Sequence, residues 1–214
     1  MSWKSVNSIP KLELGPSRLE LHHALQIPAI LARSFLGQHN EDIHANLAWE
    51  ERFGALMSRP ILASEEELRV GLVLEKLELI FWRENIILRF PFKGRNWEAA
   101  WNWVKENLPE FGLDPAKIMM EQPYASDLPN FPTQDGTDFS FGNPEVYSYF
   151  SSFYANTQYI LGETLKTVSE ASEIRCWPHH FDMASLLDLG EGKSIGLGMS
   201  PGDGTYEEPY FYIT

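Results

Sequence analysis

Apolar and polar residues alternate between positions 68 and 92, and this pattern constrains the fold more than any other stretch of the chain. A period of two is typical of strands that bury one face. The apolar phase shifts once, at Glu75-Lys76, and a slip of one residue would turn the apolar face of a strand to water. A bulge or tight turn at that point removes the conflict. With a second turn at Arg83-Glu84-Asn85, the stretch predicts an antiparallel β-meander.

The C-terminal part of the chain predicts further strands. We expect them at residues 173–177, 182–189, 193–199 and 208–214. Glycine and proline favour the turns between them. In a meander, successive turns alternate between the two ends of the sheet, so the turns at Pro178-His179 and Pro201-Gly202 lie at the same end. The hypothesis is that Asp203 there approaches His179 or His180.

Three stretches have the periodicity of amphipathic helices. The first, 17–36, begins with Ser17 and Glu20 in a capping-box pattern. Pro28 lies inside it and predicts a kink or a break, because proline has no amide donor. The second helix follows Asn96 as N-cap, and the third starts at Asn143-Pro144 and runs for about 25 residues.

The remaining segments are less regular. Residues 1–16 predict an irregular N-terminal arm. Residues 43–57 fit either a helix or a strand, and alternating apolar residues favour extended structure with a turn near 52–54 and His44 at the start of the strand. The segment 122–141 contains three prolines, and a loop of this length is uncommon unless it covers part of the molecule.

These patterns predict the α+β class. We expect a single domain spanning residues 1–214, in which antiparallel β-sheet from 43–92 and 173–214 is covered by three main helices. No internal repeat or linker divides the chain.

Composition excludes several classes of partner and site. Seventeen basic and thirty acidic residues give a net charge of −13, which repels nucleic acid and anionic membrane surfaces. One cysteine, Cys176, excludes an internal disulfide and a multi-cysteine zinc site, and its place in an apolar strand predicts a shielded, inert thiol. No signal peptide or membrane-spanning run is present, so we expect a cytoplasmic protein. The sequence does not specify an oligomeric state.

Two apparent catalytic motifs fail on their chemistry. Residues 198–202 match the G-x-S-x-G pattern of a hydrolase, but Pro201 has no amide hydrogen for the oxyanion, and no histidine follows Ser200. Gly192-Lys193-Ser194 resembles the end of a phosphate-binding loop, but Leu187 stands where that loop needs glycine.

The stretch Trp177-Pro178-His179-His180-Phe181-Asp182 is the strongest candidate site, because two imidazoles lie beside a carboxylate. Its candidate catalytic residues are His179, His180, Asp182 and Asp203, and its candidate ligand-binding residues are Trp177, His179, His180, Asp182, Asp203 and Tyr210. A divalent metal would be held by His179 and Asp182 with a third ligand, for which the choices are Asp203, His44 and His22. The alternatives are acid–base chemistry without a metal and a purely structural role in pinning a β-turn.

A smaller candidate lies in the first helix. His22 and Gln26 are one helical turn apart on the same side. They form either a small polar site or part of a solvated helix face, and the solvated face is the favoured interpretation.

The motif Trp177–Asp182, followed by Ser200-Pro201-Gly202-Asp203 and Glu208-Pro209-Tyr210-Phe211-Tyr212, resembles a family of bacterial domains of unknown function. The order of elements is similar over most of the chain, and the C-terminal motifs are the specific part. Pro28 departs from the continuous first helix of that family. The resemblance implies an intracellular soluble protein with a shared pocket, and it implies no activity.

Two functions are therefore open. In the first, the protein binds a small molecule or metal in a pocket near residues 177–182 and acts on it as an enzyme or only binds it. In the second, it is a non-catalytic structural or protein-interaction domain whose polar motif only pins a turn.

Overall fold

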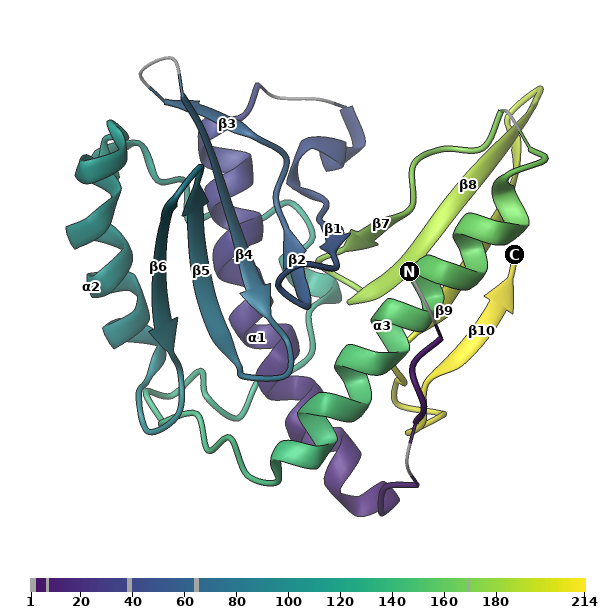
Figure 1. Ribbon diagram of the computed structural model, residues 1–214, viewed down its shortest axis with the longest axis horizontal. Coiled ribbons are helices and arrows are strands. Elements are labelled where there is room, and N and C mark those ends of the chain that lie inside the picture. The colour runs from purple at the N-terminus through teal and green to yellow at the C-terminus, as the bar shows by residue number, and fades with distance from the viewer. Residues whose placement is uncertain (1–2, 7, 38–39, 64–65, 169) are drawn as a thin grey trace.

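The computed structural model describes residues 3–6, 8–37, 40–63, 66–168 and 170–214. Within these residues, three α-helices pack on two antiparallel sheets (Figure 1). The helices are α1 (Lys11–Phe35), α2 (Trp97–Asn107) and α3 (Pro144–Leu165). The strands are β1 (Ala48–Glu50), β2 (Ala55–Met57), β3 (Ile61–Ala63), β4 (Glu66–Val73), β5 (Glu78–Arg83), β6 (Ile86–Pro91), β7 (Arg175–Trp177), β8 (Asp182–Gly190), β9 (Lys193–Ser200) and β10 (Tyr210–Ile213). The predicted α+β class is confirmed.

The larger sheet contains the predicted meander. Its order is β1-β2-β4-β5-β6, and β3 pairs with β4 beyond the end of β2. The shift in apolar phase at Glu75-Lys76 falls in the tight turn between β4 and β5, as predicted. α1 runs behind β4, and α2 lies beside β6 (Figure 1).

The smaller sheet has the order β10-β9-β8-β7, a meander of the four strands that the C-terminal sequence predicts. It is joined to the larger sheet by reciprocal backbone hydrogen bonds between Leu47 and Cys176, of 3.0 and 2.7 Å. One continuous hydrophobic core includes Leu47, Leu72 and Met183, and thus residues of both halves.

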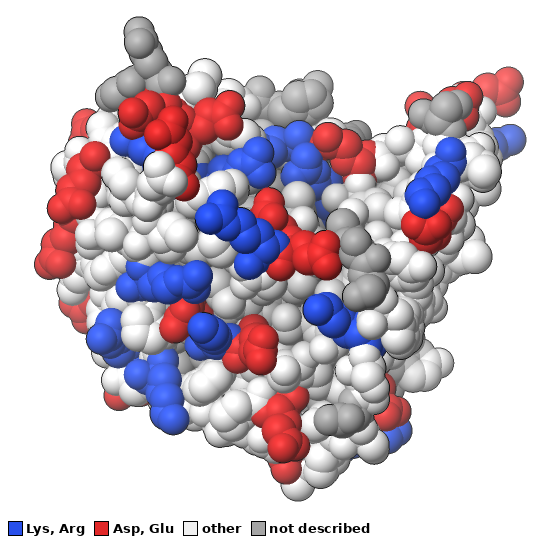
Figure 2. Space-filling view, viewed as in Figure 1, with Lys and Arg blue, Asp and Glu red and all other residues white. Residues whose placement is uncertain are grey.

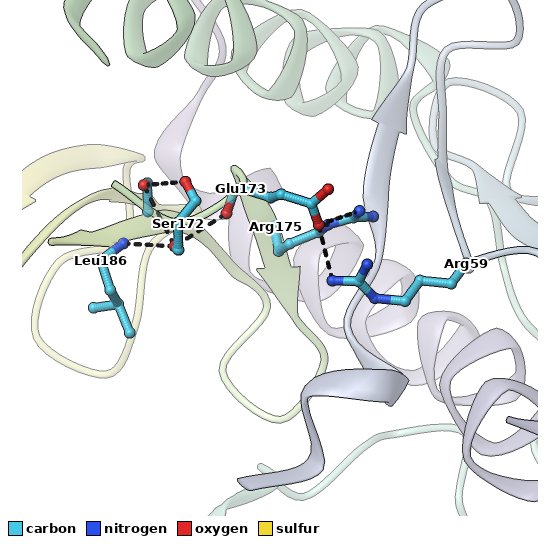
Figure 3. A network of polar contacts seen from close by, with 6 residues as sticks. Arg59, Ser172, Glu173, Arg175 and Leu186 are labelled. Carbon is cyan, nitrogen blue, oxygen red and sulfur yellow. Dashed lines mark hydrogen bonds and ion pairs between the residues drawn. The ribbon is translucent and has the colours of Figure 1, made fainter. Parts of the chain in front are cut away.

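A second polar link joins the halves near the sheet junction. Glu173 accepts hydrogen bonds from Arg175 and pairs with Arg59, which precedes β3, at 3.0 Å (Figure 3). In the same network, Ser172 receives the Leu186 amide at 2.9 Å and so fastens the segment before β7 to β8.

Helix α1 departs from the prediction at both its start and its middle. It begins at Lys11, so residues 11–16 are helical and not part of an irregular arm, and it continues through Pro28 without a break. The lost backbone hydrogen bond is outweighed by burial, since most of the helix from Leu21 to Arg33 is inaccessible to solvent.

Other sequence signals are placed as expected. Asn96 accepts the Ala99 amide and Asn143 accepts the Glu145 amide, so both act as N-caps. Residues 43–57 are mainly extended with a turn at 51–54, but His44 lies in a short 3-10 helix (Asn40–Ala45) and not at the start of a strand.

In a capping box the Glu20 carboxylate would accept the backbone amide of Ser17, but in the structure it accepts other groups. Its carboxylate accepts the Ser140 amide and hydroxyl, both at 2.7 Å, the Phe141 amide at 3.1 Å and the Tyr147 hydroxyl at 2.5 Å. Glu20 therefore fastens the end of the long loop and the start of α3 to the middle of α1.

The outer face of the larger sheet carries a small apolar cluster. Ala55, Met57, Val73 and Ile80 form it, and the Arg52 and Arg69 guanidinium groups stack over Trp82 beside it.

On the side of the molecule drawn in Figure 2, cationic and anionic side chains are interspersed, so the net charge of −13 does not form one continuous field there.

Candidate functional site

Helix α1 fixes the turn between β7 and β8 through one carbonyl oxygen. The Pro178 oxygen accepts hydrogen bonds from His22 Nε2 and from Gln26 Nε2, each at 2.8 Å. Both side chains are buried, so they are not part of a solvated helix face as the favoured interpretation held. Because a carbonyl only accepts, His22 carries its proton on Nε2. Burial lowers the pKa of His22 to about 3, so this imidazole is neutral at pH 7.

The turn itself is tightly closed. The Phe181 amide donates to the Trp177 oxygen at 2.8 Å, and the buried Tyr154 hydroxyl of α3 donates to the Phe181 oxygen. Phe181 has a φ of +59°, a conformation that is rare for a residue other than glycine. Its ring is fully buried and stacks on His22, with ring centroids 5.2 Å apart. These contacts determine where His179 and His180, which lie between Pro178 and Phe181, project from the turn.

His179 and His180 project from this turn toward solvent and toward each other. Their ring centroids are 4.2 Å apart, and His179 stacks on Tyr124 at 4.4 Å. His180 is exposed and His179 is half-buried. Burial lowers the pKa of His179 to about 4, and the neighbouring His180 makes a smaller contribution in the same direction. His179 is therefore neutral near pH 7, which is the form that ligates metals.

The residue that completes the cluster is Asp127. It ends a short 3-10 helix (Ala125–Asp127) in the long proline-containing loop. One ligand atom from each of Asp127, His179 and His180 lies within 4.8 Å of the other two. The structure thus brings Asp127 to the two imidazoles in the place where the sequence predicts Asp182, Asp203, His44 or His22.

The cluster lies at the edge of a pocket of about 220 Å³. Four segments meet there: α1, the loop after α2, the β7–β8 turn and the β9–β10 loop. The lining residues are Arg18, Leu19, His22, Asp127, Pro129, His179, His180, Phe181, Pro201, Gly202, Asp203 and Gly204. The prediction that the turns at Pro178-His179 and Pro201-Gly202 lie at the same end of the sheet is confirmed.

Asp203 lines this pocket, but its carboxylate is used within its own loop. Oδ1 accepts the Thr205 and Tyr206 amides at 2.6 and 2.8 Å, and Oδ2 accepts the Tyr210 hydroxyl at 2.6 Å. Asp203 belongs to no metal-ligating cluster of the described residues. Tyr210, a candidate ligand-binding residue, is thus a partner of Asp203 and does not line the pocket.

Asp182 does not line the pocket and is bonded within the smaller sheet. Its Oδ2 accepts the Tyr212 hydroxyl, while Oδ1 is buried without a hydrogen-bond partner. Burial raises the pKa of Asp182. Tyr212 reaches Asp182 by lying over Gly198, where an added Cβ would come within 2.6 Å of the tyrosine ring. Asp182 therefore connects β8 to β10.

Two other predicted residues lie beside the cluster without joining it. The Trp177 ring meets His179 edge-on, with centroids 6.2 Å apart. His44 lies next to Asp42, with Nε2 3.6 Å from Oδ1, and is not one of the three clustered ligands.

His23 occupies a separate, apolar site under the long loop. Its ring lies between Trp97 and Phe131, with centroid distances of 4.0 and 4.5 Å, and Nδ1 is 2.5 Å from the Thr133 hydroxyl. Burial lowers the pKa of His23 to about 4. The loop 122–141 thus covers α1 and also carries Asp127, in agreement with the prediction that it covers part of the molecule.

Sequence reasoning missed two pocket residues, Asp127 and Arg18. Asp127 is one acidic residue among thirty, in a loop without periodicity, and only the fold shows that it faces a histidine pair. A signal for Arg18 does exist, because it precedes His22 by one helical turn and so lies on the same face of α1.

A scan against protein-family models and searches of curated proteins and solved structures found no match to this chain.

Among the described residues, no helix combines the length and the apolar character needed to cross a membrane.

Proposed function

We propose that this protein binds a divalent transition-metal ion through Asp127, His179 and His180 and holds a small molecule beside it in the adjoining pocket. The observation that carries the proposal is the convergence of three ligand atoms, from segments far apart in sequence, at the edge of a pocket. Two imidazoles and a carboxylate favour zinc or a neighbouring first-row metal over calcium or magnesium, which prefer oxygen ligands.

The present spacing needs only a small adjustment to hold an ion. Donor atoms in a tetrahedral zinc site with bonds of about 2.0–2.1 Å lie about 3.3 Å apart. The clustered atoms are within 4.8 Å, and Asp127 and His180 are both exposed, so rotation of their side chains can close the gap. His179 is the fixed member, because Tyr124 stacks against it.

Three protein ligands leave an open coordination position, as in catalytic rather than structural zinc sites. A metal with an open position lowers the pKa of bound water to about 7 and polarises an oxygen of a bound molecule. The chain's own contribution is the placement of the ligands, through the hydrogen bonds of His22 and Gln26 to Pro178. The proposal includes an enzymatic role for the protein. It also includes a cytoplasmic location.

The resemblance to the bacterial domain family supports the same location. The motifs at 177–182 and 200–203 supply six residues that line this pocket: His179, His180, Phe181, Pro201, Gly202 and Asp203. We propose that the chain is related to that family and that its members share the pocket.

The test is a zinc titration of the purified, chelator-treated protein, followed by calorimetry and by the visible spectrum of the cobalt(II) form. We expect one ion per chain and a loss of affinity of at least ten-fold in D127N and in H179Q. D135N is the matched control, because Asp135 is an exposed aspartate in the same loop. No binding by the parent protein, or equal affinity in D127N and D135N, would contradict the proposal.

A second function is favoured by the hydrogen bonds that close the turn. The hydrogen bonds of His22 and Gln26 to the Pro178 oxygen, and of Tyr154 to the Phe181 oxygen, are what a purely structural motif requires. In that case the protein is a non-catalytic structural or protein-interaction domain. H180A distinguishes the two, because His180 is exposed: the structural role predicts unchanged zinc binding and unchanged stability, and the metal site predicts weaker zinc binding.

A further inference from the structure

Arg18 lies in the wall of the pocket and forms no ion pair within the part of the chain that the structure describes. It lies on α1 one turn before His22, and both residues line the same cavity. Its Nη2 donates a hydrogen bond to the Asp203 backbone oxygen at 3.3 Å. Nη1 is shielded from solvent and has no hydrogen-bond partner among the described residues.

The nearest carboxylates do not neutralise this guanidinium. Asp203 and Glu207 are close enough to act on Arg18 electrostatically, but neither forms an ion pair with it. The two Asp203 oxygens already accept two amides and the Tyr210 hydroxyl. Burial lowers the pKa of Arg18, and the nearby Asp203 and Glu207 offset this only in part.

The β9–β10 loop is shaped to admit the guanidinium. Gly202 has a φ of +104°, a conformation that residues with a Cβ rarely adopt. An added Cβ would collide with Arg18 Nη1 and would lie 2.5 Å from the Glu207 backbone oxygen. The glycine of the Ser-Pro-Gly-Asp motif therefore makes room for Arg18 at the pocket wall.

An arginine that is half-buried and unpaired is satisfied best by an oxyanion, because its planar fork of donors matches carboxylate and phosphate geometry. We propose that the molecule held in this pocket carries a carboxylate or phosphate group that pairs with Arg18. The pocket volume of about 220 Å³ is below the ~300–1,000 Å³ of drug-sized ligand sites, so the ligand is a small acid or phosphate ester.

This inference deepens the proposed function and rests on the pocket being a ligand site, while the metal is tested separately. Arg18 belongs to α1 and the metal ligands to the facing loop and turn. The two groups can therefore be removed one at a time.

The experiment measures binding of inorganic phosphate and of acetate to the full chain by calorimetry, with and without zinc. We expect saturable binding of at least one anion by the parent protein and a loss of affinity of at least ten-fold in R18Q. The matched control R52Q changes an exposed arginine on the outer face of the larger sheet and should bind like the parent. The anion that binds more tightly identifies the group as phosphate or carboxylate.

A spectrum of the parent protein makes the test independent of how well R18Q folds. In ¹H–¹⁵N spectra, the Arg18 Nε–H and the amides of Gly202 and Asp203 should shift saturably as phosphate or acetate is added. No saturable binding of either anion, shifts confined to Arg52 and Arg69, or equal affinity in a folded R18Q and the parent would overturn the inference.

The zinc titrations keep the two proposals apart. If phosphate or acetate binds through Arg18 in a protein that takes up no zinc, the metal proposal alone fails. If zinc binds through Asp127 and neither anion binds, the inference about Arg18 alone fails.

Discussion

His22 in α1 donates its Nε2 hydrogen to the carbonyl oxygen of Pro178 at 2.8 Å, across a separation of 156 residues in sequence. The bond lies between a buried helix and the turn that carries both histidines of the candidate metal site. It makes the position of that turn dependent on α1, and the first prediction tests this dependence.

Replacing His22 by phenylalanine keeps an aromatic ring on Phe181 but removes the donor. Pro178 keeps its bond from Gln26, so we expect the free energy of unfolding to fall by about 1 kcal/mol. The displaced turn should also weaken zinc binding. Urea unfolding and a zinc titration measure the two effects, and unchanged values in both would show that Gln26 alone fixes the turn.

Replacing Glu20 by glutamine should be strongly destabilising. All four groups that surround its carboxylate are donors, and an amide nitrogen cannot accept from any of them. We expect the free energy of unfolding to fall by about 1.5–3 kcal/mol, the range for hydrogen bonds to a charged group. E106Q, an exposed change on α2, is the control for urea unfolding, and an equal effect in both variants would refute the role given to Glu20.

Substitution of alanine at Gly202 should destabilise the protein, and the same substitution at Gly204 should not. Gly202 has a positive φ and a crowded Cβ position, whereas no atom lies within 4 Å of the Cβ position at Gly204. We expect G202A to lower the free energy of unfolding by about 1–3 kcal/mol and G204A to change it by less than about 0.5 kcal/mol. Thermal unfolding of both variants makes the comparison, and equal melting temperatures would contradict it.

Cys176 should resist modification in the native state. The side chain is fully buried, and burial raises the pKa of its thiol, so almost no reactive thiolate is present. The sequence-based prediction of a shielded thiol is confirmed by this placement. We expect a thiol reagent to label native protein at least a hundred times more slowly than urea-unfolded protein, and equal rates would contradict it.

Acid should destabilise the protein through His23. Its pKa is about 4 in the folded state and about 6.5 when unfolded. The unfolded chain therefore takes up a proton that the folded protein does not, and stability falls as the pH decreases from 6.5 toward 4. The full loss is about 3 kcal/mol. Urea unfolding across this range should have a shallower pH dependence in H23F, which keeps the ring between Trp97 and Phe131, than in the parent.

Strands β4 to β10 and the starts of α2 and α3 could be predicted because their signals are local, whereas β3 was not predicted and residues 43–57 fitted either a helix or a strand. Alternation, turn residues and the caps Asn96 and Asn143 act within a few positions of the element that they define. The first residue of α1 could not be predicted in this way. Its first turns contain Gly15 and Pro16, which oppose a helix locally, and the burial that stabilises it comes from distant segments.

The candidate site was predicted in part for the same reason. His179 and His180 are neighbours in sequence, and the shared end of the β8–β9–β10 meander followed from the number of turns. Asp127 is brought to the histidines only by the packing of the long loop on α1. Asp182 was predicted as a ligand because it is adjacent to them in sequence, but its carboxylate accepts the Tyr212 hydroxyl and does not line the pocket.

The two hydrogen bonds from α1 to the Pro178 oxygen affect how the protein folds during synthesis. α1 emerges from the ribosome before the β7–β8 turn, and its donors His22 and Gln26 must wait for an acceptor that is synthesised more than 150 residues later. Until then the apolar side chains of α1 that are buried in the folded protein, such as Leu21 and Leu25, stay exposed, and chaperones bind exposed apolar surface of this kind. Folding dominated by such distant pairings is slow, so the pocket should be the last part of the molecule to become competent.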